Sequence, residues 1–351
     1  MDTDLLIVGG GPAGCAAAVM AASVGMRSVL IESGDALCGA LRRIPVVRNV
    51  LTATNGPDLA AAIEADLAQC ELCRVELGHR ATLIDAFDDR VEATVERVEA
   101  TVDRVEATVE RVEATVERVE PVGAAGSARA PGLRLTAPYV VVATGVGPLG
   151  PEGAEWLGGM AGRAVPQLWE ADPAAIDDRT VLVLGADRPL GTVARAHPEL
   201  KARFVVAYPP EDAYKTEEVR RDPRVELMAV RRLELGPGST SAPVTAEVET
   251  VAGERRTLTA DVAFLNLGSA PAPPAGAVAV DRSGYCPPGG QHPRIFTAGD
   301  LRSVRFQRIA TAMGSGGEAA LGAYYASRDL PMETGGPPTV VGGPPGPAGG
   351  G

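Results

Sequence analysis

Residues 4–14 read "DLLIVGGGPAG" and decide the fold. The apolar run "DLLIV" is typical of a buried strand, and the alanine-rich stretch that begins at Pro12 is typical of a helix. Between them, Gly9, Gly11 and Gly14 match the pattern G-x-G-x-x-G. Such glycines permit a tight turn, close backbone approach to a pyrophosphate and close helix packing, and the helix N-terminus offers amide donors. The stretch predicts a strand, a turn and a helix that bind a dinucleotide.

The next strand supplies the second part of this pattern. Residues 28–32, "SVLIE", place Glu32 about 20 residues beyond the glycines, where a carboxylate can accept hydrogen bonds from a ribose diol. Strand, helix and strand in this order predict an α/β fold built on a parallel, doubly wound sheet. The predicted cofactor-binding residues of this first site are Gly9, Gly11, Pro12, Ala13, Gly14 and Glu32.

A second unit of the same kind begins near Thr180, but its turn is altered. The segment "TVLVLGADRPLG" keeps the first glycine as Gly185, whereas Asp187 takes the second position and Leu190 the third. A carboxylate at the second position adds bulk and repels a phosphate. The chain therefore predicts two nucleotide-type folds in series, of which the second has a spoiled binding turn.

Two later strands indicate which dinucleotide the first site takes. The segment "APYVVVATG" at 137–145 ends in Ala-Thr-Gly, and "HPRIFTAGD" at 292–300 ends in Ala-Gly-Asp before a glycine-rich helical stretch. Together with "GGGPAG" and Glu32, they resemble the three signatures of flavoproteins with two dinucleotide-binding domains. The spacing and the short chain resemble the thioredoxin reductase family over nearly the whole length, apart from a repeat and a C-terminal tail.

This resemblance implies two Rossmann-like domains and FAD as the cofactor. The FAD domain is expected to be discontinuous, formed by residues 1–150 and 262–334, with an insertion at 90–120. A domain resembling a nicotinamide-nucleotide domain is expected at 151–261. Further residues that the resemblance places near FAD are Asn49, Thr144, Gly145, Gly299, Asp300, Gln307, Arg308 and Ile309.

The same comparison exposes two departures from the family. Its redox Cys-x-x-Cys pair falls on Leu168 and Ala171, which carry no electrons, so a thioredoxin reductase is not expected. The basic cluster that the family uses for NADPH is absent from "AYPPEDAYK" at 207–215. We therefore do not expect the second domain to bind NADPH or NADH in the usual way. A vestigial domain with a structural or substrate-shaping role is favoured over a domain that binds either nucleotide. The pair Cys70 and Cys73 has redox spacing, but ordinary thiols are the favoured interpretation.

A near-perfect repeat interrupts the first domain. Residues 90–117 are four heptads of the form "RVEATVE", and their valines lie alternately four and three apart, as in Val91, Val95, Val98 and Val102. This spacing favours an extended or coiled helix. A long hairpin and disorder remain alternatives, because Val and Thr are weak helix formers. The repeat is expected to have no chemical role, although its valine stripe offers a route to the homodimer that we expect.

Composition narrows the environment and the partners. The chain has 351 residues, 45% of them hydrophobic, and a formal net charge of −12. The negative charge argues against a nucleic-acid partner, which needs clustered cations. No basic leader and no long apolar run are present, so we expect a cytoplasmic protein with no membrane association. The Gly- and Pro-rich tail at 335–351 is expected to be disordered.

The expected function is that of an FAD-dependent oxidoreductase that oxidises a small-molecule substrate at the flavin without a cysteine relay. Trp169 and Glu170, between the two lost cysteine positions, are weak candidates for a substrate pocket, and no metal site is expected. One alternative is an NAD(P)H-dependent reductase of a ferredoxin- or flavodoxin-type carrier. Another is a non-catalytic flavin-binding protein that senses redox state or assembles through the heptads.

Overall fold

The computed structural model describes residues 3–98, 133–237 and 243–330, and its first sheet is parallel throughout. The central strands β1, β2 and β7 are short, mostly apolar runs buried along their whole length, as expected for a sheet covered on both faces. In spatial order the strands are β18 (Ile295–Thr297), β7 (Tyr139–Val142), β1 (Leu5–Val8), β2 (Ser28–Ile31) and β3 (Cys73–Glu76).

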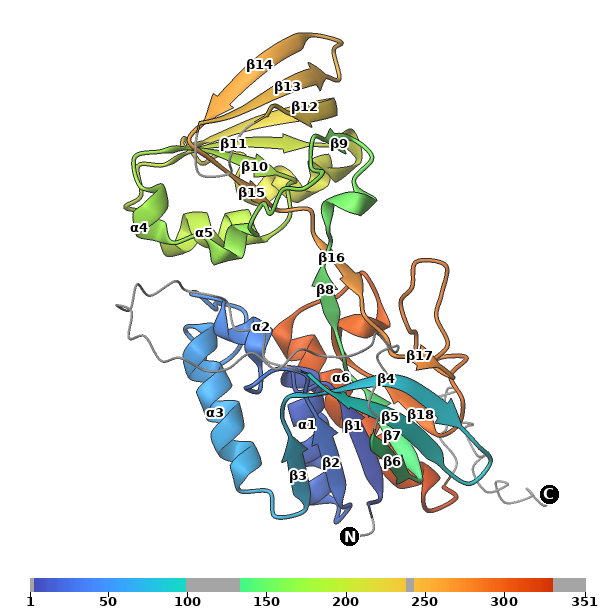
Figure 1. Ribbon diagram of the computed structural model, residues 1–351. Coiled ribbons are helices and arrows are strands. Elements are labelled where there is room, and N and C mark those ends of the chain that lie inside the picture. Colours follow the sequence, from blue (N-terminus) through green and yellow to red (C-terminus); the bar gives the residue numbers. More distant parts are fainter. Residues whose placement is uncertain (1–2, 99–132, 238–242, 331–351) are drawn as a thin grey trace, which may run out of the picture.

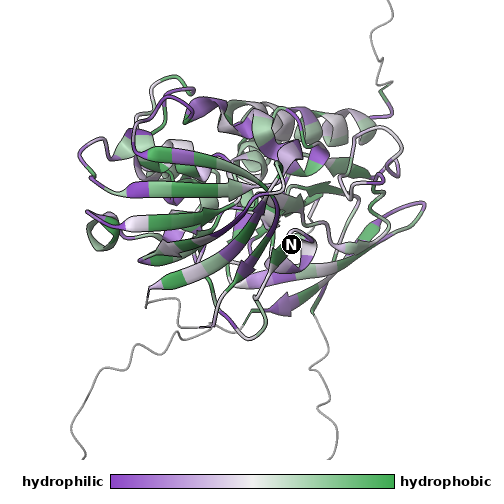
Figure 2. Ribbon diagram, turned by 90° about the horizontal axis from the view of Figure 1, so that it is seen from above, coloured by the Kyte–Doolittle hydropathy of each residue, from purple (hydrophilic) through white to green (hydrophobic). Residues whose placement is uncertain are grey.

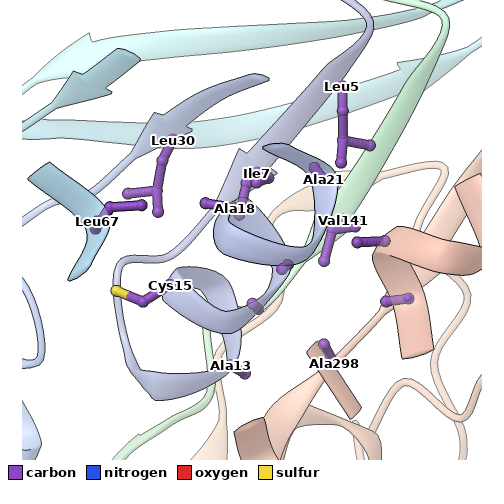
Figure 3. Close-up of a cluster of buried hydrophobic side chains, with 14 of the residues drawn as sticks. Leu5, Ile7, Ala13, Cys15, Ala18, Ala21, Leu30, Leu67, Val141 and Ala298 are labelled. Carbon is purple, nitrogen blue, oxygen red and sulfur yellow. The ribbon is translucent and has the colours of Figure 1, made fainter. Parts of the chain in front are cut away.

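Helices cover one face of this sheet, and a smaller sheet covers the other (Figure 1). On the helical face, α1 (Pro12–Ser23) packs with α3 (Gly56–Ala68) and α6 (Ile309–Ala326) around a core that includes Leu5, Ile7 and Leu30 (Figure 3). The short helix α2 (Gly39–Arg42) leads into α3. The smaller sheet contains β17 (Ala275–Gly276), β4 (His79–Ala86), β5 (Val91–Arg97) and β6 (Leu133–Ala137).

The first heptad corrects the helical prediction for the repeat. Val91–Arg97 forms strand β5, paired antiparallel with β4 and β6. Val91, Ala93 and Val95 alternate on the buried face and are at most 2% exposed. Counting valines alone gave the helical spacing and left out Ala93, which completes the period of two that a half-buried strand requires. Residues 99–120, which hold the remaining repeats, and the tail at 335–351 lie outside the described residues.

The second sheet contains the strands β9 to β15, which lie between Leu157 and Leu265 in the chain. Hydrophobic residues run along these strands (Figure 2). Helices α4 (Pro173–Ile176) and α5 (Pro189–Ala196) lie beside the sheet in Figure 1. In spatial order the strands are β14 (Arg255–Ala260), β13 (Val244–Thr250), β12 (Val225–Leu235), β11 (Arg203–Tyr208), β10 (Thr180–Leu184) and β15 (Val262–Leu265), and β9 (Leu157–Gly158) pairs with β12.

Two short strands connect the halves of the molecule. The chain leaves the first half through β8 (Val146–Pro148) and returns through β16 (Ser269–Pro271), which pair antiparallel with each other (Figure 1). The expected α/β class with two Rossmann-like units is thereby confirmed. Among the described residues, no helix is both long and apolar enough to cross a membrane.

Helices α1 and α6 approach each other at a glycine. A Cβ atom added to Gly316 would lie 2.0 Å from the carbonyl oxygen of Ala13, so no side chain fits there. Two residues earlier in the same helix, a Cβ on Gly314 would meet no atom within 4 Å. The close contact is therefore made by the face of α6 that carries Gly316. This face packs against the N-terminal end of α1, next to the glycine turn at 9–14.

We expect Gly316→Ala to lower the free energy of unfolding by about 1–3 kcal/mol, because the added methyl group overpacks the helix contact. Gly314→Ala is the matched control, and we expect it to be neutral or stabilising by up to about 1 kcal/mol through helix propensity. Urea denaturation of both variants measures the difference, and equal stabilities would contradict the packing argument.

Candidate functional site

Four neighbouring parallel strands end at one edge of the first sheet. These are β18, β7, β1 and β2, and the carboxyl ends of parallel strands meet at the same edge. In open α/β sheets, ligands bind outside this edge. The structure brings together here the residues that follow each strand, namely Gly9, Gly11, Pro12, Ala13, Gly14, Glu32, Thr144, Gly145, Gly299 and Asp300.

The three glycines of the first turn have different tasks. Gly9 has φ +106°, and a Cβ there would lie 2.4 Å from the carbonyl oxygen of Ala143. A Cβ on Gly14 would lie 1.8 Å from the carbonyl oxygen of Gly9. A Cβ on Gly11 would meet no atom within 4 Å, so this position faces open space rather than protein. The turn thus leaves its second glycine open to a ligand, at the helix N-terminus where anions bind.

Glu32 is fixed by the backbone around it. Its carboxylate accepts hydrogen bonds from the amide of Gly10 at 2.6 Å and from the amide of Gly34 at 2.7 Å. The Ser33 hydroxyl donates to the same carboxylate at 3.1 Å. The side chain is therefore held at the rim of the turn, and its contact with a ribose remains a prediction.

Thr144 presents a polar atom that the protein does not satisfy. Its Oγ1 is buried and has no hydrogen-bond partner among the described residues. Buried hydroxyl groups nearly always have a partner, so an orphan at a strand end fits a missing polar ligand. The next residue, Gly145, has φ +67°, which lets the chain turn away from the sheet into β8.

Asp300 is the most perturbed carboxylate at this edge. It lies in the short 3-10 helix Gly299–Arg302, and burial raises its pKa, while the nearby Arg188 and Arg308 act in the opposite direction. The amide of Gly299 donates to Ser315 Oγ of α6 at 2.8 Å. A mostly buried carboxylate beside two cations is suited to accept a hydrogen bond from a hydroxyl-bearing ligand.

The residues before α6 are arranged around its N-terminus. The Gln307 side chain donates to the carbonyl oxygens of Ser303 at 3.1 Å and Asp300 at 3.4 Å. Arg308 is the N-cap residue and Ile309 the first residue of the 18-residue helix. The helix therefore directs its free amides toward the edge that carries Asp300. Asn49 is exposed in a turn after α2, and its role near a flavin remains a prediction.

The second turn repeats only the first glycine of this design. Gly185 has φ +109°, and a Cβ there would lie 2.3 Å from the carbonyl oxygen of Asn266, just as Gly9 lies against Ala143. Asn266 Nδ2 donates to the carbonyl of Asp187 at 2.8 Å and to that of Gly185 at 3.3 Å. The side chain of Asn266 thus fixes the backbone of this turn at Gly185 and at Asp187.

The third position of the second turn also differs in packing. Leu190 is 1% exposed and inserts into the hydrophobic core, whereas Gly14 brings helix and turn into backbone contact. The helix that follows, α5, has 8 residues against 12 in α1.

A contact between the two halves was not predicted from the sequence. Arg188, the N-cap residue of α5, donates from Nη1 to the carbonyl oxygen of Gln307 at 3.0 Å. Arg308 donates from its Nη1 to the same oxygen at 2.9 Å. The altered second turn therefore contacts the segment that precedes α6. The one sequence signal for this contact is Arg188 itself, a cation in a turn that normally binds phosphate.

The first of the lost cysteine positions, Leu168, begins a 3-10 turn, Leu168–Glu170, beside α5, and the second, Ala171, follows directly after this turn. Leu168 is fully buried in the hydrophobic core of the second sheet. The exposed Glu170 accepts from the amide of Gln167 at 3.1 Å and so caps its own turn. Trp169 is half-buried, and its Nε1 has no hydrogen-bond partner among the described residues. A substrate role for Trp169 and Glu170 remains a prediction.

A cleft of about 590 Å³ opens between the linker and the strand ends of the second sheet. Its lining carries both charges, and its one lysine, Lys215, is already paired with Asp212 at 2.8 Å. The residues that bound it include Leu149, Trp156, Pro209, Glu211, Lys215 and Arg231.

The family model described as "Pyridine nucleotide-disulphide oxidoreductase" matches residues 3–186, which is more than half of the chain. The chain belongs to this family. The match spans the first glycine turn and reaches the start of the second. A search of curated proteins finds no match.

Solved structures agree with this membership at the level of the fold. Thioredoxin reductase from Lactococcus lactis, in its FR conformation, matches with a TM-score of 0.70 at 19% identity, over 94% of this chain and 100% of that one. Thioredoxin reductase from T. acidophilum matches with a TM-score of 0.68 at 20% identity, over 93% and 99%. Bacillithiol disulfide reductase from Bacillus cereus matches with a TM-score of 0.64 at 18% identity, over 93% and 100%. The chain has the fold of thioredoxin reductase-like flavoproteins.

We expect Arg188→Ala to loosen the contact between the halves, because it removes the hydrogen bond to Gln307. Limited proteolysis in the linker strands β8 and β16 should become several-fold faster, since cleavage follows the population of open states. Arg195→Ala is the matched control in the same helix, because Arg195 pairs with Glu218 within the second half. Equal cleavage rates in the two variants would show that Arg188 does not hold the halves together.

We expect Asp300→Asn to stabilise flavin-free protein at pH 7 by at most about 1 kcal/mol, or roughly 2 °C in Tm. Burial raises the pKa of Asp300 above its unfolded value. The contribution of Asp300 to stability is therefore full below the unfolded pKa and is lost as the pH rises through the folded pKa.

The gain in the Asn variant should shrink near pH 3.5, just below the unfolded pKa of 3.8, because the carboxyl group is then mostly protonated in both states. Thermal denaturation of both proteins at the two pH values makes the comparison. A variant less stable than the parent at pH 7 would mean that Arg188 and Arg308 outweigh burial.

Proposed function

We propose that this protein is an FAD-dependent oxidoreductase that oxidises a small-molecule substrate directly, without a cysteine relay and without a functional nicotinamide-nucleotide site. The observation that carries the proposal is the contrast between the two turns. The first leaves Gly11 open to a ligand, and the second places the Asp187 carboxylate at the equivalent position.

The first edge fits FAD in several independent respects. The amides at the start of α1 are free to bind a pyrophosphate, and Glu32 lies at the rim where an adenosine ribose would be held. The orphan hydroxyl of Thr144 and the partly buried carboxylate of Asp300 are suited to the polar middle of the cofactor. FAD, when bound, would supply two-electron redox chemistry at this edge.

The absence of a relay rests on the positions of the cysteines. Leu168 is fully buried, and none of the five cysteines falls within 151–261. In a thioredoxin reductase, a thiol pair at these positions relays electrons from the flavin to a substrate disulfide, and Leu168 and Ala171 cannot serve in its place. Electrons are therefore proposed to enter from an organic substrate and to leave to oxygen or to a carrier.

The second half argues against an ordinary nucleotide donor. Asp187 repels phosphate, and Asn266 holds its turn in place. Lys215, the first cation after β11, is already paired with Asp212. The hydrogen bond of Arg188 to Gln307 joins the altered turn to the segment that precedes α6, which supports a structural task for this turn. We propose a structural or substrate-shaping role for this half.

The first test is anaerobic titration of the purified protein with NADPH and then NADH, following the flavin absorbance band. We expect no rapid bleaching by either nucleotide and full bleaching by dithionite. Rapid bleaching would overturn the proposal and favour an NAD(P)H-dependent reductase of a ferredoxin- or flavodoxin-type carrier.

The variant Asp187→Gly sharpens this test. Removing one close negative charge should tighten nucleotide binding by about tenfold, or roughly 1.4 kcal/mol. Asp178→Asn, in the exposed loop after α4, is the control for a general change in charge. Isothermal titration with NADPH measures both, and an unchanged affinity in Asp187→Gly would show that the carboxylate is not what blocks the site.

A further inference from the structure

Cys15 and Cys38 are 23 positions apart in the chain, but both lie next to the glycine turn at 9–14. Cys15 lies in the first turn of α1, and Cys38 is the residue immediately before α2. Both side chains are 1% exposed and belong to the same hydrophobic core. In Figure 3, the Cys15 sulfur points away from α6, on the side of α1 toward Leu67. The function proposed above uses neither thiol.

One carbonyl group joins the two cysteines. The Cys15 thiol donates to the carbonyl oxygen of Gly10 at 3.3 Å, and the amide of Cys38 donates to the same oxygen at 2.8 Å. Gly10 is also the residue whose amide binds the Glu32 carboxylate. The two cysteines therefore converge on the peptide that connects the phosphate turn to the predicted ribose carboxylate.

The thiols differ in character. Each thiol shifts the pKa of the other: the interaction with Cys38 raises the pKa of Cys15, and the interaction with Cys15 lowers the pKa of Cys38. Burial adds to the increase at Cys15 and opposes the decrease at Cys38. Cys38 is thus the group of the pair that more readily becomes a thiolate, which is the nucleophilic form. Its backbone has φ +56°, an uncommon conformation for a residue with a side chain.

We propose that Cys15 and Cys38 form a reversible disulfide that locks the adenosine end of the cofactor site. The oxidant is hydrogen peroxide. Cys38 gives up its proton, the thiolate attacks one peroxide oxygen, the O–O bond breaks, and the departing hydroxide takes up that proton, so that a sulfenic acid and one water form. The Cys15 sulfur then attacks the Cys38 sulfur, a second water leaves, and the two thiols have lost two electrons and two protons in total. A dithiol reductant restores the pair.

The link would add a covalent bond between two segments that otherwise meet through hydrogen bonds and hydrophobic packing. Residues 33–38, between β2 and α2, carry no helix or strand and lead from Glu32 to Cys38. Tying this segment to α1 restrains the Gly10 peptide and the ribose carboxylate together. Restraint of a site in its bound geometry slows ligand release. The effect on FAD rests on the function proposed above, whereas the disulfide itself does not.

The test treats the holoprotein with hydrogen peroxide and analyses it by intact mass and by non-reducing peptide mapping. We expect a loss of about 2 Da and a single linked peptide pair joining Cys15 to Cys38. Dithiothreitol should reverse the change. FAD release from the oxidised form should be about tenfold slower than from the reduced form.

The matched control is the other thiol pair, Cys70 and Cys73, which has redox spacing and greater exposure. The loss of mass should persist in a Cys70→Ser, Cys73→Ser variant and disappear in Cys38→Ser. Circular dichroism shows whether Cys38→Ser is folded. If that variant fails to fold, alkylation of the parent protein before and after peroxide, followed by mapping, decides the pairing.

Three results would overturn the inference. The link could map to Cys70 and Cys73, Cys15 and Cys38 could stay alkylatable after peroxide and unfolding, or the link could form with no change in FAD release. A protein that forms the link but binds no FAD would instead refute the proposed function and leave the disulfide standing. The two failures are therefore distinguishable.

Discussion

The contact between Gly9 and the backbone of Ala143 is the constraint on which the rest of the structure depends. Because no side chain fits there, the ends of β1 and β7 come together and α1 begins directly above the sheet edge. The same contact recurs between Gly185 and Asn266 in the second half. Both halves therefore contain the same close contact between a glycine turn and the neighbouring strand end. Only in the first half does the next position of the turn, Gly11, stay open to a ligand.

The second half shows how a fold outlasts a binding site. The first glycine is required by the packing of the turn on the neighbouring strand, so it persists as Gly185. The second glycine is required only by a phosphate, so Asp187 can replace it without harm to the fold. Leu190 fills the core with a hydrophobic side chain, and Arg188 contacts the first half. Structure and ligand binding thus depend on different residues of one short motif.

Local patterns explain which features could be predicted from the sequence. The first turn, Glu32 and the strand ends at Thr144 and Asp300 are defined by residues close together in the chain, and the structure brings them to one edge. Contacts across long separations could not be found in this way. Cys15 with Cys38 and Arg188 with Gln307 depend on tertiary packing that no spacing rule contains. The helical prediction is wrong for the first heptad, because the spacing of the valines alone omits Ala93. Together with Val91 and Val95, Ala93 completes the alternation of a strand.

The pairing of β5 with β6 explains why the fold tolerates a long insertion between these strands. Val95 lies opposite Leu133, so the chain leaves this sheet and re-enters it at adjacent positions. The entropy of closing a loop grows only with the logarithm of its length, and doubling the intervening stretch costs about 0.6 kcal/mol. The first heptad is held in the sheet by its buried Val91, Ala93 and Val95. Because β5 and β6 stay paired whatever the length of chain that joins them, an insertion at this point adds little to the free-energy cost of folding.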